Sequence, residues 1–237
     1  MGCEVGGGKG LSRMAAKITA SRSDDRRVVS PPERENAPFW SRFARFYETF
    51  IHVTTRNYPE LVRRVAHEVG DARRVLDVGT GTGLMAFETS KRAGFVEAVD
   101  FAPGMIALAR RKADELGVRN VRFSLQSAYA LDFPDGSFDA VVASNVLHCM
   151  KMAERALGEI RRVLSPGGIL VAPTFCHAGS HWTRVLSRLS MLVGFRPYRM
   201  LTTESLAGLI ESCGFEVLTR EEWKDVIPLA YVVARAV

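Results

Sequence analysis

The stretch VLDVGTGTGLMA, residues 75–86, constrains the fold of this chain more than any other segment. Its apolar residues and single carboxylate, Asp77, predict a strand, and three alternating glycines lead from that strand into a helical pattern. Glycines between a strand and a helix let a ligand approach the backbone, and the helix N-terminus offers unpaired amides to an anionic group. The stretch therefore predicts an α/β fold with a nucleotide-like ligand.

Strands and helices alternate along the chain after this stretch, which predicts a parallel sheet. The last two predicted strands are joined by a link too short for a parallel crossover, so we expect them to form an antiparallel pair. The predicted strands are 75–79, 96–100, 121–125, 138–144, 168–174, 215–221 and 229–236, and the predicted helices are 83–92, 103–116, 152–164, 180–193 and 203–213.

The N-terminal part of the chain divides in two. Residues 1–36 are rich in Gly, Ser, Arg and Asp and lack apolar periodicity, so we expect a disordered leader. From Phe39 onward, aromatic residues recur at helical spacing and predict an amphipathic helix, and a second helical pattern at 61–69 ends at Gly70. The interpretation is a leader over 1–36 followed by one domain over 37–237.

Composition narrows the class of protein. With 47% hydrophobic and 24% charged residues, the chain matches a soluble globular protein. The longest stretch without charged residues, 163–183, is broken by proline and glycine and predicts no membrane span. The four cysteines include no C-x-x-C pair, which favours a reducing, cytoplasmic compartment. The net charge of +6 comes from scattered basic residues and is typical of a solvated surface.

The glycines alone leave two kinds of ligand open. The dinucleotide fingerprint G-x-G-x-x-G/A fits Gly81, Gly83 and Ala86, and Asp100 follows at the distance of a ribose-binding acid. Dinucleotide enzymes usually need no carboxylate at Asp77, however, and no tyrosine here has a lysine four residues on, as a short-chain dehydrogenase requires.

Four segments, in order, resemble the class I S-adenosylmethionine-dependent methyltransferases, especially the branch of ubiquinone/menaquinone biosynthesis and phospholipid N-methylation. They are VLDVGTGTG, VDFAPGMIALARRKA, LDFPDGSFDAVVASNVLHCM and EIRRVLSPGGILV, and the resemblance covers roughly residues 40–235. It implies an enzyme with S-adenosylmethionine as cofactor. It also implies a Rossmann-like, seven-stranded, mostly parallel sheet with helices on both faces and an antiparallel last strand.

The resemblance also implies a cofactor site. Asp100 should accept both ribose hydroxyls, because an ionised carboxylate accepts two hydrogen bonds. Gly79 and Gly81, with Thr80 between them, should admit the methionine part of the cofactor, and Asp77 should bind its ammonium through amides or water. The other implied residues are Phe101 and Met105 on the adenine ring (with a core role as the alternative for Met105), Ser127 on the adenine amino group, Ala128 through its backbone, and Asn145 at the methionine end.

One triplet departs from the family. Relatives usually carry Gly-Asp-Ala after the third strand, where the carboxylate contacts the adenine amino group, whereas this chain has Gln126-Ser127-Ala128. Ser127 can still accept a hydrogen bond, without the charge, so we expect weaker cofactor binding. The same departure is the one feature that favours a cofactor-binding regulatory protein without catalysis.

Two regions are expected to form the acceptor site. One is an N-terminal helical lid, 37–70, in which Tyr47 should lie closest to the cofactor, and the other is a substrate-binding insertion, 175–200. His148 is the candidate catalytic base, with a packing role as the alternative. The basic, aromatic character of the first helix also suits a peripheral contact with a membrane surface.

The predicted function is methyl transfer to a small-molecule or lipid-like acceptor. A phosphatidylethanolamine-type acceptor is favoured by the basic, aromatic helix, and a quinone-like metabolite by His148. A nucleic-acid substrate is not expected, since the N/D-P-P-Y motif and an appended nucleic-acid domain are missing from the sequence. No metal is expected either, because Cys176, His177 and His181 lack a fourth partner.

Overall fold

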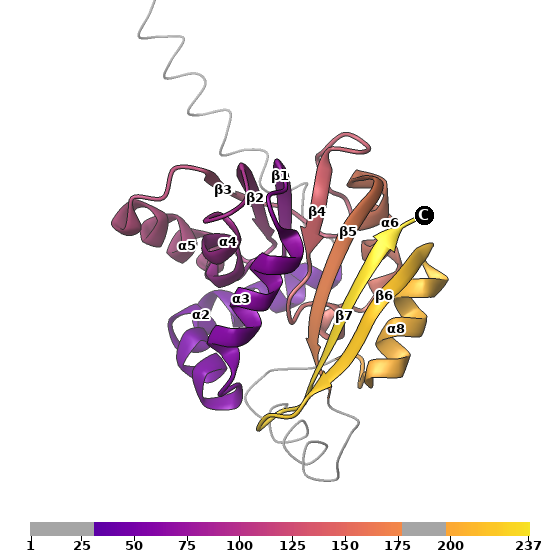
Figure 1. Cartoon of the computed structure of the whole chain (residues 1–237). Helices are drawn as coiled ribbons and strands as arrows, with labels where there is room; N and C mark the ends of the chain where they lie inside the picture. Colours follow the sequence, from indigo (N-terminus) through magenta and orange to yellow (C-terminus); the bar gives the residue numbers. More distant parts are fainter. Residues whose placement is uncertain (1–30, 177–197) are drawn as a thin grey trace, which may run out of the picture.

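The computed structural model describes residues 31–176 and 198–237, and its centre is a seven-stranded sheet (Figure 1). The strand order is β3-β2-β1-β4-β5-β7-β6; β7 runs antiparallel to β5 and to β6, and all other neighbouring strands pair in parallel. This confirms the predicted fold class. The strands are β1 (Arg74–Val78), β2 (Phe95–Asp100), β3 (Val121–Leu125), β4 (Phe138–Val142), β5 (Leu164–Phe175), β6 (Phe215–Trp223) and β7 (Leu229–Ala236).

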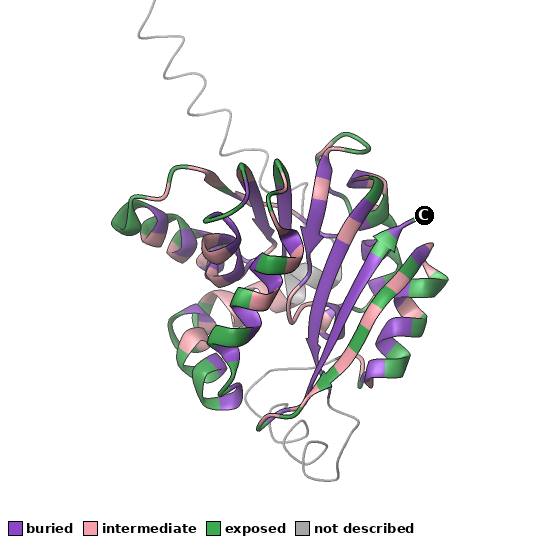
Figure 2. Cartoon of the chain, viewed as in Figure 1, coloured by how far each residue is buried: buried purple, intermediate pink, exposed green. Residues whose placement is uncertain are grey.

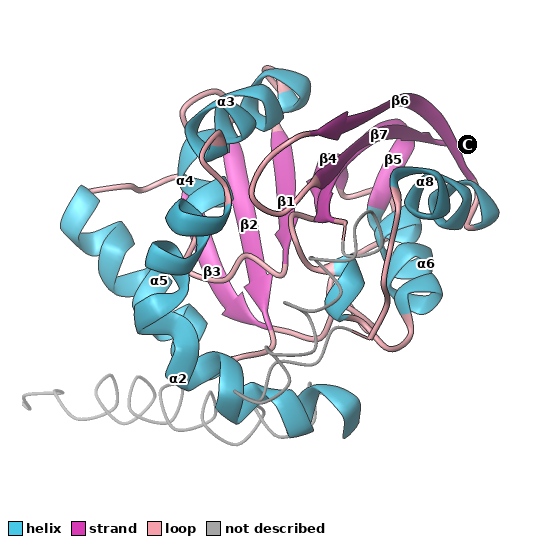
Figure 3. Ribbon diagram, turned by 90° about the horizontal axis from the view of Figure 1, so that it is seen from below, coloured by secondary structure: helices cyan, strands magenta, loops and turns pink. Residues whose placement is uncertain are grey.

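Helices cover both faces of the sheet, as Figure 3 shows. The apolar sides of α3, α4 and α5 pack on one face, and those of α6 and α8 pack on the other, each around its own buried cluster. The described helices are α2 (Pro31–Thr54), α3 (Tyr58–Val69), α4 (Leu84–Thr89), α5 (Pro103–Leu116), α6 (Ala153–Val163), α8 (Thr203–Ser212) and the short 3₁₀ turn η1 (Leu147–Cys149).

Burial along the strands follows from this layering (Figure 2). The strands β1 and β4 are covered on both faces and consist almost wholly of buried residues, as expected of parallel strands between two helical layers. The edge strand β6 instead alternates between exposed and less exposed residues after Phe215. The core therefore lies on both faces of the central strands. The loop of alternating glycines, residues 79–83, follows the carboxyl end of β1 and is called the glycine loop below.

Local sequence signals set several helix ends. Helix α5 starts at Pro103, a residue well suited to a first turn, and stops before Gly117, which adopts a left-handed φ of 66°. Helix α8 begins with a capping box, in which Thr202 and Ser205 exchange hydrogen bonds between side chain and backbone.

Other boundaries differ from the predicted ones. Helix α2 begins at Pro31, so residues 31–36, which were expected in the leader, are helical. Proline is tolerated in the first turn of a helix, and these residues lack the apolar periodicity by which a helix is predicted. Helix α4 ends at Thr89, before the predicted end at residue 92, and the hydroxyls of Thr89 and Ser90 donate to carbonyls of the preceding turn. The predicted helix 180–193 lies outside the described residues.

Helix α2 is fastened to the rest of the fold near the glycine loop. The Gly104 amide of α5 donates to Ser41 Oγ at 3.1 Å, and a Cβ added at Gly104 would lie 2.6 Å from Ser41 Cα. Glu48 accepts a hydrogen bond from Thr82 Oγ1 at 2.7 Å and forms an ion pair with Lys112. These contacts hold one side of α2 against α5 and the loop that follows β1.

Candidate functional site

The glycine loop leaves β1 in a conformation that favours glycine. Gly79, Gly81 and Gly83 have φ angles of 69°, 56° and 89°, in the left-handed region. A Cβ added at Gly79 would lie 2.4 Å from Cγ2 of Val146, which belongs to the loop after β4. The loops after β1 and β4 therefore meet at the point where the strand order reverses, the usual ligand position in an open α/β sheet.

Asp100 is held at the end of β2 by two backbone amides. Its Oδ2 accepts a hydrogen bond from Gly81 N at 2.9 Å, and its Oδ1 accepts one from Ala102 N at 2.8 Å. The side chain is 7% exposed and borders the hollow beside the glycine loop. The carboxylate thus has a fixed orientation before any ligand arrives.

Asp77 lies beneath the same loop and is 1% exposed. It accepts a hydrogen bond from Thr80 Oγ1 at 2.6 Å. Burial raises the pKa of Asp77 to about 7; the Thr80 bond opposes this rise and the negative charge of Asp100 adds to it. Asp77 and Thr80 therefore support the loop from below and do not border the two hollows described next.

Two adjoining hollows, both open to solvent, lie at this end of the sheet. They share one set of lining residues, and each adds its own. The shared residues are Trp40, Gly79, Asp100, Phe101, Val146 and Cys149; the first hollow adds Asn36, Val78, Val99, Gln126, Ala128, Tyr129, Met150, Lys151 and Tyr198, and the second adds Tyr47, Gly81, Met105 and Asn145.

Most of the residues assigned from the sequence meet around these hollows. Eight of them are lining residues, namely Tyr47, Gly79, Gly81, Asp100, Phe101, Met105, Ala128 and Asn145. Four are not, namely Asp77, Thr80, Ser127 and His148.

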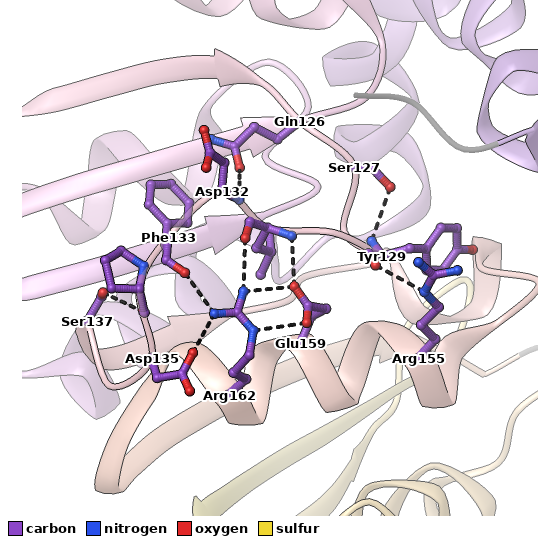
Figure 4. A network of polar contacts seen from close by, with 12 residues as sticks. Gln126, Ser127, Tyr129, Asp132, Phe133, Asp135, Ser137, Arg155, Glu159 and Arg162 are labelled. Carbon is purple, nitrogen blue, oxygen red and sulfur yellow. Dashed lines mark hydrogen bonds and ion pairs between the residues drawn. The ribbon is translucent and has the colours of Figure 1, made fainter. Parts of the chain in front are cut away.

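Ser127 is turned away from the hollow that it was expected to line. Its Oγ accepts a hydrogen bond from Tyr129 N at 3.1 Å, within the loop that follows β3 (Figure 4). The residue is almost fully buried, and it is the preceding Gln126 that borders the hollow. This geometry does not support the expected contact between Ser127 and an adenine amino group.

His148 lies in η1 and is 2% exposed. Its ring packs edge-on against Phe175, with 6.0 Å between the ring centroids. Its carbonyl oxygen accepts hydrogen bonds from the backbone amides of Tyr198 and Arg199. The structure thus shows the packing role that was the alternative for this residue, and the role as a base stays a prediction.

Tyr47 reaches the second hollow from α2, and its ring lies beside Gly81. Burial raises the pKa of the Tyr47 phenol well above its usual range, and the nearby Cys149 and Asp100 act in the same direction. The phenol therefore stays protonated near neutral pH. Tyr47 can donate a hydrogen bond to a ligand and cannot act as a base there.

Asn145 combines an unusual backbone with an unused donor. Its φ is 52°, the only positive value among non-glycine residues of the described chain. Its Oδ1 accepts a hydrogen bond from Phe175 N at 3.1 Å, while its buried Nδ2 has no hydrogen-bond partner within the described residues. Since buried polar groups are nearly always paired, this amide is a group that a bound ligand would satisfy.

Sequence reasoning gave no role to several residues that border the first hollow, among them Asn36, Gln126, Tyr129, Cys149 and Lys151. Gln126 carried a signal, because it begins the triplet that departs from the family. The other four follow β3, follow β4 or come from a distant part of the chain, so only the folded arrangement brings them together.

Contacts between distant segments lie at and near the first hollow. Asn36 Nδ2 of α2 donates to the Tyr198 hydroxyl at 3.0 Å, and Arg199 forms an ion pair with Glu154 of α6. Most of the predicted insertion 175–200, with His177 and His181, lies outside the described residues. Within residues 31–176 and 198–237, no cluster of three metal-ligating side chains occurs, and no helix is long and apolar enough to cross a membrane.

The chain is similar to known methyltransferases. The family model described as "Methyltransferase domain" matches residues 76–172. The demethylmenaquinone methyltransferase of Thermus thermophilus is 40% identical over 166 residues, which are 61% of this chain and 75% of that protein. The phosphatidylethanolamine N-methyltransferase of Cereibacter sphaeroides is 41% identical over 110 residues, 46% of this chain and 54% of that protein.

Among solved structures, the [4+2]-cyclase SpnF superposes with a TM-score of 0.64 at 25% identity, covering 75% of this chain and 80% of that one.

Proposed function

The chain belongs to the S-adenosylmethionine-dependent methyltransferases, and we propose that its acceptor is an apolar, quinol-like ring with an ionisable hydroxyl. One observation carries this proposal. Among the described residues that line the two hollows, Asp100 is the only acid and Lys151 the only base. The Lys151 ammonium, in a lining that is mostly apolar and aromatic, favours a phenolate over an ammonium group.

The residues present fit the cofactor. Bound S-adenosylmethionine supplies a methyl group already activated by a sulfonium. We assign Asp100 to its ribose hydroxyls, the backbone of Gly79 and Gly81 to its methionine part, and Phe101 and Met105 to its adenine ring. The unpartnered Nδ2 of Asn145 is a donor for its carboxylate.

The acceptor side is built from apolar and aromatic side chains. Trp40 and Val146 line both hollows, and Met150 and Tyr198 line the first beside Lys151. A planar ring would bury most of its surface there, and its phenolate would lie near the lysine ammonium. Alignment of acceptor and methyl group, with water excluded, is then the main task of the protein.

Of the two proposed catalytic residues, Tyr47 fits as a donor to an acceptor oxygen. His148 would reach an acceptor only if its packing on Phe175 changed. A pre-ionised phenolate needs no base to attack the methyl group with its ring carbon. The hydrogen on that carbon is then lost as a proton in a tautomerisation that can follow release into water, so the proposal predicts that His148→Gln retains most of the turnover. A steep loss confined to turnover, with normal cofactor affinity, would instead make His148 the base.

The name of one relative supports a quinol-like acceptor, and the name of another gives the alternative, a phospholipid amine. The Thermus thermophilus protein is named for demethylmenaquinone and the Cereibacter sphaeroides protein for phosphatidylethanolamine. An ethanolamine ammonium would find no carboxylate beyond Asp100 among the described lining residues. The quinol-like acceptor therefore has the better electrostatic match.

Helix α2 fits the role of a lid, since its contacts at Ser41 and Glu48 hold it beside the glycine loop. Its other side carries Phe46 and Val53, which are 65% and 66% exposed. We also propose that the protein is cytoplasmic and contacts the membrane surface through this side of α2, where it receives a lipid-like acceptor. Sedimentation with anionic vesicles tests the contact, and no binding would contradict it.

Calorimetric titration with S-adenosylmethionine, S-adenosylhomocysteine and NAD comes first, and we expect saturable binding of the two sulfur compounds only. The acceptor test then offers a reduced naphthoquinone with hydrogen at its accepting ring carbon, and separately phosphatidylethanolamine vesicles, with product detected by mass spectrometry. Methylation of the lipid alone would support the alternative. Methylation of neither, with normal cofactor binding, would support a regulatory protein without catalysis.

Lys151 offers the sharpest variant. Lys151→Met should raise the KM for the reduced naphthoquinone about tenfold, because one charge-assisted contact is lost. The matched control is Lys224→Met, an exposed lysine outside both hollows, which should behave like the wild type.

A further inference from the structure

We propose that Gln126 binds the base edge of the cofactor's adenine, in place of the carboxylate that relatives use one position later. The inference rests on cofactor binding, which the proposed function shares, and does not depend on the identity of the acceptor. It assigns a specificity role to a residue that replaces the glycine of the family triplet.

Position is the first argument. Gln126 follows β3, the strand next to β2, and its backbone N donates to Asp100 O at 3.1 Å. It lines the first hollow together with Asp100 and Phe101. A ligand whose ribose lies on Asp100 and whose base packs on Phe101 would direct the edge of that base toward β3.

The neighbouring serine does not compete for this contact. Ser127 Oγ is engaged by Tyr129 N inside the loop, and Tyr129 O accepts a hydrogen bond from Arg155 Nε at 3.1 Å (Figure 4). Helix α6 therefore anchors the loop segment that carries the serine hydroxyl. Of the two polar side chains in the triplet, only that of Gln126 borders the hollow.

The Gln126 side chain is held in one orientation. Its Oε1 accepts a hydrogen bond from Asp132 N at 3.0 Å, and its Nε2 donates to Ser124 Oγ at 3.1 Å. These bonds also distinguish the amide oxygen from the amide nitrogen. An amide oxygen can accept two hydrogen bonds and an amide nitrogen can donate two, so each atom keeps the capacity for one more.

The loop that supplies Asp132 N is itself clamped. Arg162 of α6 donates to the carbonyls of Leu131 and Phe133 and forms ion pairs with Glu159 and Asp135 (Figure 4). Glu159 Oε2 accepts a hydrogen bond from Leu131 N at 2.9 Å. The clamp fixes the residues on both sides of Asp132, and through Asp132 it fixes the amide of Gln126.

The chemistry of the amide matches adenine. The edge of adenine presents an amino donor beside a ring-nitrogen acceptor, and a glutamine amide pairs with both at once. A carboxylate can only accept, and a serine hydroxyl is too short to span both groups. Gln126 therefore distinguishes adenine from hypoxanthine, in which the amino group is replaced by an oxygen.

Calorimetric titration with S-adenosylhomocysteine and S-inosylhomocysteine tests the proposal. The wild type should bind the adenine compound about tenfold more tightly than the hypoxanthine compound. Gln126→Ala should weaken binding of the adenine compound about tenfold and remove the discrimination. Gln126→Glu, which keeps the length but loses the donor, should give a smaller loss of about threefold.

Ser127→Ala is the matched control and should bind both compounds like the wild type, and thermal melting shows which variants are folded. Unchanged discrimination in Gln126→Glu or Gln126→Ala would overturn the proposal, as would loss of discrimination in Ser127→Ala. If the wild type bound neither compound, the cofactor assignment itself would fall. That result is distinct from normal wild-type binding that Gln126 does not influence.

Discussion

The site has two halves, which differ in what positions their polar groups. The cofactor half is formed by the glycine loop and Asp100, and the acceptor half by α2 and the residues around Lys151 and Tyr198. In the cofactor half, backbone amides position the polar groups, as Gly81 N and Ala102 N do for Asp100. In the acceptor half, side chains of distant segments meet one another, as Asn36 does with Tyr198 in the lining of the first hollow. A half built on backbone depends on a few special residues, whereas a half built on side chains depends on how whole elements dock.

If backbone amides position the cofactor half, replacing the carboxylate that they hold, Asp100, should have the largest effect on cofactor affinity. Asp100→Ala should lower the affinity for S-adenosylhomocysteine at least about 100-fold, because two buried amides and the ribose lose their acceptor. Calorimetric titration measures this, with Asp114→Ala on the exposed side of α5 as the control. Wild-type affinity in Asp100→Ala would contradict the site assignment.

The next largest effect tests the glycine loop. Gly79→Ala should lower the free energy of unfolding by about 2–4 kcal/mol, because the new Cβ combines a left-handed backbone with overpacking on Val146. Gly117→Ala has nearly the same φ and no atom within 4 Å of its Cβ, so it should cost only about 1 kcal/mol.

Denaturant titration compares these two variants. Val146→Ala placed in the Gly79→Ala background should recover part of the loss, since it removes the clashing methyl groups. Equal losses in Gly79→Ala and Gly117→Ala would mean that backbone strain alone decides.

A third test uses pH. The pKa of Asp77 is raised from its usual value of 3.8 to about 7, so the folded protein binds up to one more proton than the unfolded chain between these values. This contribution to stability is complete below pH 3.8 and is lost as pH rises through about 7, by up to about 1.4 kcal/mol per pH unit. Glu48, Glu154 and Glu159 have lowered pKa values and act in the opposite direction, but only below about pH 4.5.

Asp77→Asn should therefore flatten the fall in stability between pH 4.5 and 7. Denaturant midpoints across that range measure it, and an unchanged slope in the variant would show that another group titrates.

The smallest effect concerns the acceptor half. Gly104→Ala should displace α2, because the new Cβ would lie 2.6 Å from Ser41 Cα. We expect the KM for the acceptor to rise about threefold to tenfold, with cofactor affinity within about twofold, in line with a loss of roughly one ordinary contact. Gly158→Ala, in an exposed and open part of α6, controls for the helical substitution. A larger loss of cofactor affinity than of acceptor affinity would contradict the assignment of α2 to the acceptor half.

The same division explains what the sequence could predict. The parallel sheet follows from the alternation of strands and helices, and Asp100 and Gly79 are placed by motif because backbone geometry dictates them. Ser127 was assigned by position in a triplet, and a bond from Tyr129 N turned its hydroxyl away. Tyr198 belongs to the insertion 175–200 that was expected to form part of the acceptor site, but its contact with Asn36 had no local signal, because only the folded chain brings the two residues together.

The contact between Gly79 and Val146 has a consequence for how such a protein can evolve. The two residues belong to different loops, one beside the cofactor and one beside the acceptor, yet they occupy a shared boundary with no spare volume. A larger side chain at position 146 would press on the loop that holds the cofactor. Adaptation to new acceptors is therefore directed toward residues such as Tyr198 and Lys151, which can change without disturbing the half that all acceptors have in common.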